Sequence, residues 1–123
     1  MSKKIMIVDD SSMMRMALNS ALKESGYTVI EAIHGLDALA KLQTGERVNL
    51  IICDVNMPEM DGLTFVKTYR AIPELQYIPV LMLTTESGQD MKDQGKAAGV
   101  RAWMVKPFNK ETLMSAVGKL VCA

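Results

Sequence analysis

The chain has 123 residues, of which 49% are apolar and 23% charged. Domains usually contain about 100–150 residues, so we expect a single domain over residues 1–123 and no fused output module. The 14 basic side chains balance the 14 acidic ones, which leaves no net charge to attract nucleic acid. No apolar run reaches the about 18 residues of a membrane span, and the N-terminus lacks a signal-peptide pattern. These features predict a cytoplasmic monomer that folds alone and does not insert into membranes.

Three short apolar runs, 5–8, 50–53 and 80–83, are continuous rather than alternating. Such runs are typical of strands covered on both faces of a parallel sheet. Two mixed runs, 27–32 and 101–105, contain Glu31 and Arg101, so we expect these strands nearer the sheet edges.

Helical patterns separate the strands. Apolar residues at helical spacing predict a helix over 12–25 with Ser11 or Ser12 as its N-cap. Further helices are expected from Gly35 to Gly45, from Gly62 to a point before Pro73, from a Ser87 cap to Gly99, and after an Asn109 cap. The alternation predicts an α/β fold, a three-layer (βα)5 doubly wound parallel sheet.

Polar residues follow four of the strands: Asp9 and Asp10, Asp54, Thr84 and Thr85, and Lys106. Ligands in such sheets bind beyond the carboxyl ends of the strands, so these side chains are expected in one crevice. Three carboxylates held together repel one another unless a cation joins them. Oxygen ligands without His or Cys favour a hard ion, which we expect to be Mg²⁺, with Mn²⁺ able to substitute. The two cysteines, Cys53 and Cys122, are far apart and predict neither a disulfide framework nor a zinc cluster.

A carboxylate cluster with one Lys and one Thr is suited to phosphoryl transfer. A Gly-rich phosphate cradle is missing, because GxGxxG does not occur and the string from Gly88 to Lys96 has the wrong spacing for a P-loop. Nucleotide binding is therefore not expected. The remaining role is that a carboxylate, Asp54, itself accepts the phosphoryl group.

Four motifs carry a resemblance to a known family: IVDDS at 7–11, DVNMPEMDG at 54–62, LTT at 83–85 and VKPF at 105–108. Together they resemble the receiver domain of two-component response regulators, over the whole chain. The chain is most similar to the single-domain, CheY-like regulators of bacterial chemotaxis, which implies a flavodoxin-like sheet of strand order 2-1-3-4-5.

The resemblance implies that Asp54 is the phosphoacceptor and that Asp9 and Asp10 bind Mg²⁺ together with Asp54 and the Asn56 backbone carbonyl. It also implies that Lys106 pairs with the phosphoryl oxygens. Two further family features are implied: Thr84 donates its hydroxyl to the bound phosphoryl group, and the peptide bond before Pro107 is cis.

The implied partners are a histidine kinase as phosphodonor, a phosphatase, and a downstream protein, which is the flagellar switch if the protein is chemotactic. The family's output surface lies on the fourth helix, fifth strand and fifth helix, where Trp103 replaces the usual Tyr or Phe. We expect an indole to turn outward less easily than a phenol, and a fixed Trp filling an edge groove is the alternative. Asn56, Thr85 and Glu86 are expected to tune the lifetime of the phosphorylated state.

Other functions stay open at this point. A stand-alone receiver can act as a phosphate shuttle or sink, control a non-motor partner, or serve as an adaptor without phosphorylation. A haloacid-dehalogenase-type phosphatase also uses an Asp nucleophile and Mg²⁺. That class needs an Asp two residues after the nucleophile, and here the residue is Asn56. We therefore expect no enzyme activity beyond the protein's own phosphoryl transfer and slow autodephosphorylation.

Overall fold

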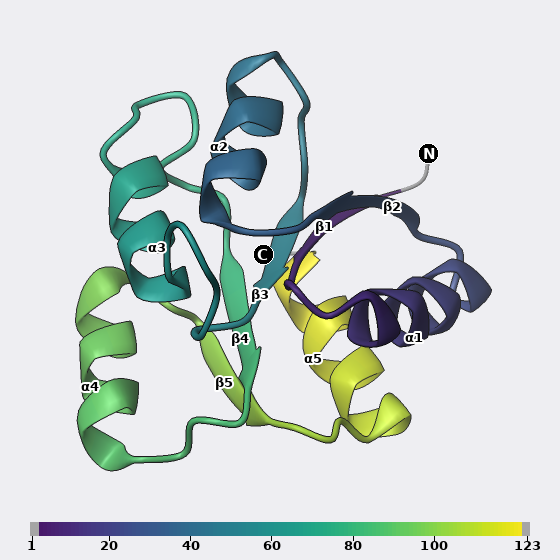
Figure 1. Cartoon of the computed structure of the whole chain (residues 1–123). Coiled ribbons are helices and arrows are strands. Elements are labelled where there is room, and N and C mark those ends of the chain that lie inside the picture. The colour runs from purple at the N-terminus through teal and green to yellow at the C-terminus, as the bar shows by residue number, and fades with distance from the viewer. Residues whose placement is uncertain (1–2, 122–123) are drawn as a thin grey trace.

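The fold was determined as a computed structural model, which describes residues 3–121. Strands and helices alternate along the described chain (Figure 1): β1 (Lys4–Val8), α1 (Ser12–Glu24), β2 (Thr28–Ala32), α2 (Gly35–Gln43), β3 (Leu50–Cys53), α3 (Gly62–Arg70), β4 (Val80–Thr84), α4 (Gln89–Ala98), β5 (Ala102–Val105) and α5 (Lys110–Val121). The strands form one parallel sheet of order β2-β1-β3-β4-β5. This arrangement confirms the predicted flavodoxin-like fold.

Each face of the sheet has its own apolar core. In Figure 1, α2, α3 and α4 cover one face while α1 and α5 cover the other. Met6, Ile51 and Met82 point to the first face and pack with residues of α2 and α3. Neighbouring strand residues, including Ile5 and Ile52, point to the second face and pack with α1 and α5. The strands at 5–8, 50–53 and 80–83 are buried on both sides, which explains why their sequences are continuously apolar.

The two mixed strands, β2 and β5, lie at the sheet edges as expected. Helix starts agree with the sequence in two cases, because Ser11 Oγ accepts from the Met14 N–H and Asn109 Oδ1 accepts from the Thr112 N–H. The prediction that Ser87 caps the fourth helix is wrong. Helix α4 begins at Gln89 after Gly88, with no side-chain cap.

Gly62 allows the chain after β3 to fold back on itself. A Cβ atom at this position would lie 2.0 Å from the carbonyl oxygen of Asp54, a distance that no side chain tolerates. The Gly62 N–H donates to the Val55 carbonyl at 2.8 Å, and the Asp61 carboxylate caps α3 by accepting from the Thr64 N–H. The loop is thereby fixed beside Asp54.

Three smaller expectations concern the rest of the chain. The Lys106–Pro107 peptide bond is cis, as the family resemblance implies. Cys53 is buried and unpaired, and burial raises the pKa of its thiol; Cys122 lies outside the described residues. Within residues 3–121, no helix is both long enough and apolar enough to cross a membrane.

Candidate functional site

The polar residues after β1, β3 and β5 meet at the carboxyl edge of the sheet. Asp9 and Asp54 follow the two neighbouring central strands β1 and β3. Lys106 follows β5 and reaches past the end of β4. Its Nζ lies 2.9 Å from Asp9 Oδ2 and 2.9 Å from Asp54 Oδ2. One ammonium therefore bridges two carboxylates.

This bridge is largely removed from water. The exposed fraction is 13% for the Lys106 side chain, 3% for that of Asp9 and 10% for that of Asp54. Burial on its own lowers the pKa of Lys106. The hydrogen bonds and charges of the two aspartates outweigh this effect, so the pKa is raised above its ordinary value. Lys106 is thus held in its charged form.

The remaining oxygens of the two carboxylates are fixed by backbone groups. Asp9 Oδ1 accepts from the Ser11 N–H at 2.9 Å, and Asp54 Oδ1 accepts from the Val55 N–H at 2.7 Å. Asp10 differs, because it is exposed and its carboxylate makes no hydrogen bond within residues 3–121. The site therefore combines two fixed carboxylates with a third that faces solvent.

Asp9, Asp10 and Asp54 each offer one carboxylate oxygen within 4.8 Å of the others. Three formal negative charges are countered at this point by the single ammonium of Lys106. A cluster of oxygen donors with one member open to solvent fits a hard divalent ion that keeps several waters, as Mg²⁺ does. The donor set thus fits the predicted metal, while the role of the Asn56 carbonyl stays a prediction.

Thr84 ends β4 in a fully buried position. Its Oγ1 accepts from the Glu86 N–H at 3.2 Å, and within the described residues no hydrogen bond joins it to Asp54. The hydroxyl proton of Thr84 therefore has no protein acceptor among the described residues.

Glu86 connects this edge to β5. Its carboxylate accepts from Asn56 Nδ2 at 3.1 Å, and its carbonyl accepts from Trp103 Nε1–H at 2.8 Å. These bonds, with that from the Glu86 N–H to Thr84, link the segment between β4 and α4 to the residues after β3 and to β5. The sequence singled out Asn56, Glu86 and Trp103, but gave no indication that one residue joins them.

Trp103 is half-buried between β5 and α4. A Cβ atom at Gly95 of α4 would lie 2.7 Å from Trp103 Cζ3, so the indole ring lies directly against the helix backbone. The ring is packed on one side and hydrogen-bonded at its nitrogen. It occupies an inward position.

The motifs, the fold and this geometry agree with the comparisons to known proteins. A model of the response regulator receiver domain matches residues 5–118. The chain belongs to the response regulator receiver family. As a receiver domain it is 42% identical over 111 residues to the chemotaxis protein CheY1 of Helicobacter pylori, covering 89% of this chain and 90% of the relative.

Further relatives of this receiver domain carry similar names. A CheY homologue from Campylobacter jejuni is 41% identical over 111 residues, which are 89% of this chain and 85% of that protein. The structure of the chemotaxis response regulator CheY4 of Vibrio cholerae superimposes with a TM-score of 0.92 at 43% identity, covering 98% of this chain and 99% of the other. The receiver domain is therefore a homologue of CheY chemotaxis proteins.

One residue near the acidic cluster was missed by sequence reasoning. Arg15 of α1 donates from a guanidinium nitrogen to the Asp9 carbonyl at 2.7 Å. A sequence signal existed, because a basic residue in the first turns of a helix lies near the residues that precede it. The pattern does not say which partner such a residue chooses.

Proposed function

We propose that this receiver domain is a phosphorylation-activated response regulator that accepts a phosphoryl group on Asp54 and signals by protein binding. The observation that supports it most is the Lys106 ammonium, 2.9 Å from both Asp9 and Asp54. A buried cation beside a fixed carboxylate is the arrangement needed to stabilise added negative charge there. The proposed phosphodonor is the phosphohistidine of a histidine kinase.

In the proposed transfer a carboxylate oxygen of Asp54 attacks the phosphorus of the donor. The new O–P bond forms as the N–P bond to the histidine breaks, and the imidazole leaves with the electron pair and takes up a proton. The Val55 N–H fixes the rotation of the Asp54 carboxylate through Oδ1. The Lys106 ammonium, which donates to both carboxylates, redirects some of its hydrogen bonds to the phosphoryl oxygens.

Asp9, Asp10 and Asp54 would hold Mg²⁺, with the Asn56 carbonyl as a further proposed ligand and Mn²⁺ as a substitute. When bound, the ion supplies charge neutralisation for the transferring phosphoryl group. Asp9 is already bonded to Ser11 and Lys106. Asp10 is free to turn toward the ion, because its carboxylate has no competing bond in residues 3–121.

The signal would pass from Thr84 to β5. When the Thr84 hydroxyl turns to donate to a phosphoryl oxygen, its Oγ1 moves away from the Glu86 N–H that donates to it. Glu86 then shifts, and with it the carbonyl that accepts from Trp103 Nε1–H. Charge-assisted hydrogen bonds contribute about 1.5–3 kcal/mol each, and about 1.4 kcal/mol changes a two-state equilibrium tenfold. If Trp103 switches, its fluorescence changes on binding beryllofluoride; an unchanged spectrum supports a fixed indole instead.

The proposed output partner is a protein, docked on α4, β5 and α5. A groove beside Trp103 is lined by Lys92, Lys96 and Arg101, so an acidic segment fits it best. Because the relatives are chemotaxis proteins, we propose the flagellar switch as this partner, acting in the cytoplasm, with a phosphatase to end the signal. A phosphate shuttle or sink, or control of a non-motor target, is the alternative. Catalysis is limited to the protein's own phosphoryl transfer and loss.

The test is labelling by acetyl phosphate with and without Mg²⁺. The wild type is expected to gain one phosphoryl group only when Mg²⁺ is present, and Asp54→Asn is expected to gain none. Asp90→Asn is the matched control, because Asp90 is exposed in the first turn of α4, outside the acidic cluster, and its variant should be labelled like the wild type. Full labelling of Asp54→Asn would contradict the assignment of Asp54 as the phosphoacceptor.

A further inference from the structure

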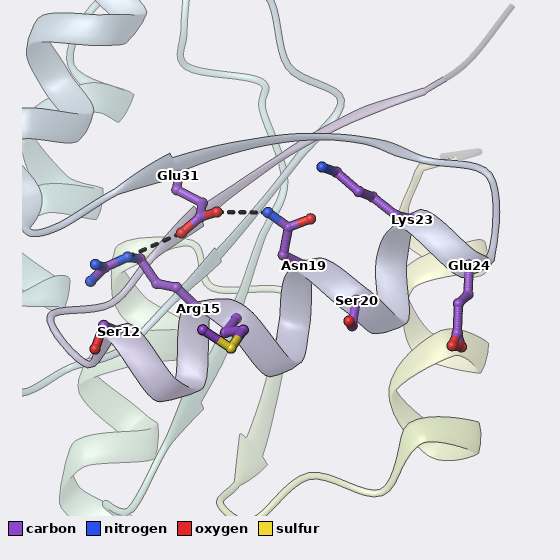
Figure 2. Close-up of a pocket in the computed structure, with 8 residues that line it drawn as sticks. Ser12, Arg15, Asn19, Ser20, Lys23, Glu24 and Glu31 are labelled. Carbon is purple, nitrogen blue, oxygen red and sulfur yellow. Dashed lines mark hydrogen bonds and ion pairs between the residues drawn. The ribbon is translucent and has the colours of Figure 1, made fainter.

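The groove between α1 and β2 contains a chain of polar contacts that ends at the acidic cluster. Figure 2 shows Arg15 and Asn19 reaching from α1 to the carboxylate of Glu31 on β2. Arg15 Nε donates to Glu31 Oε1 at 3.1 Å, and Asn19 Nδ2 donates to Glu31 Oε2 at 2.6 Å. A second guanidinium nitrogen of Arg15 donates to the Asp9 carbonyl at 2.7 Å. The Arg15 side chain thus links β2 to Asp9, the first residue of the acidic cluster.

The groups that hold Arg15 are themselves fixed. The Arg15 side chain is only 16% exposed. Glu31 pairs with Ile7 in the next-to-last pair of the β1–β2 ladder, and its backbone carbonyl accepts from Lys41 Nζ at 2.5 Å. The planar guanidinium presents its donors in a fixed fork, so the position of Glu31 determines where the remaining N–H groups point.

The bond to the Asp9 carbonyl matters for Asp10. The carbonyl of Asp9 and the N–H of Asp10 belong to the same planar peptide unit, so fixing the carbonyl fixes the Cα position of Asp10 and one of the two peptide planes that set the direction of its side chain. Asp9 has other anchors, since its N–H donates to Ala32 and its carboxylate bonds to Ser11 and Lys106. The Asp10 carboxylate makes no hydrogen bond in residues 3–121. Its orientation therefore depends on the backbone on either side of it.

We propose that Arg15, oriented by Glu31, is a positioning residue that presets the Asp9–Asp10 peptide for binding of a divalent cation. The inference rests on the proposed Mg²⁺ site and deepens it. Arg15 lies on the backbone side of Asp9 and does not itself bind the ion. Its contribution is to reduce the reorganisation that Asp10 undergoes when the ion arrives.

The direction in which Arg15→Gln changes the Mg²⁺ affinity distinguishes a positioning role from a purely electrostatic one. Arg15→Gln removes a positive charge near a cation site, which by Coulomb's law alone strengthens Mg²⁺ binding. If Arg15 positions the peptide, the same change weakens binding, by about tenfold as is typical for partners behind a metal ligand. The measurement is a calorimetric titration with Mg²⁺ alone, without phosphodonor, on the full chain, with urea unfolding recorded for each variant.

Two further variants complete the test. Lys23→Gln removes the same charge from an exposed position at the other end of α1 and should leave the Mg²⁺ affinity within about twofold of the wild type. Arg15→Lys keeps the charge but loses the fork, so it should also weaken binding, and it replaces Arg15→Gln if that variant does not fold.

The outcomes distinguish this inference from the proposed function. Weaker binding in both Arg15 variants, with Lys23→Gln unchanged, supports it. Equal or tighter binding in an Arg15 variant, or an equal loss in Lys23→Gln, overturns the positioning role alone. If the wild type binds no Mg²⁺ and Asp10→Asn gives the same calorimetric titration, the proposed metal site is overturned, and this inference with it.

Discussion

Replacing Lys106 by methionine removes the ammonium that bridges Asp9 and Asp54, while keeping a side chain of similar length. Two carboxylates with exposed fractions of 3% and 10% then lose their counter-charge and one hydrogen bond each. Removing one partner of a buried ion pair typically costs about 3–5 kcal/mol, because the other charge is left uncompensated. Water entering beside the exposed Asp10 reduces this cost. We expect the free energy of unfolding to fall by about 2–4 kcal/mol without metal.

The assay is urea unfolding followed by circular dichroism, with and without Mg²⁺. Because the divalent ion would replace the missing cation, Mg²⁺ should restore more stability to Lys106→Met than it adds to the wild type. The matched control is Lys110→Met, whose ion pair with Glu24 is short but has side chains 52% and 60% exposed. That variant should lose less than about 1 kcal/mol. Equal losses in the two variants would refute the view that Lys106 carries the charge balance of the site.

Three further predictions concern pH, a strained residue and a tight contact. The pKa of Lys106 is raised in the folded state above 10.5, its value in the unfolded chain. The stability that this shift contributes is full below pH 10.5 and is lost as pH rises through the folded pKa. The free energy of unfolding should therefore fall more steeply above that pH in the wild type than in Lys106→Met. Glu59 has φ of 68° and is exposed, so Glu59→Asn should raise the free energy of unfolding by about 0.5 kcal/mol in urea, since Asn tolerates this conformation better. Gly95→Ala, which pushes a Cβ toward Trp103, should cost about 1–3 kcal/mol and shift Trp103 fluorescence. Gly118→Ala on α5 meets open space and should instead gain about 0.5–1 kcal/mol; equal effects of the two alanines would contradict the packing described for the indole.

The fold was largely predictable because burial leaves a direct trace in the sequence. Strands covered on both faces, such as 50–53, are continuously apolar, and Glu31 in the 27–32 run correctly indicated an edge strand. Caps were predictable where a side chain can satisfy an N–H within three residues, as for Ser11 and Asn109. The Ser87 cap was wrong because the chain stays extended through Gly88, which precedes the first turn of α4 without a side-chain cap.

The site was predictable as a set of strand ends but not as a network. Parallel strands bring their carboxyl ends to one edge, which is why Asp9, Asp54 and Lys106 could be grouped in advance. The hydrogen bonds of Arg15 and Glu86 depend on which of several reachable partners each side chain meets. That choice is made by tertiary packing and has no periodic pattern in the sequence.

The most direct test of the central claim is to identify the residue that carries the phosphoryl group. After incubation with acetyl phosphate and Mg²⁺, borohydride reduces an aspartyl phosphate to homoserine, and peptide mass spectrometry locates the change. We predict homoserine at position 54 alone, and none when Mg²⁺ is omitted. Homoserine at Asp9 or Asp10, or at no aspartate under full labelling, would contradict the account.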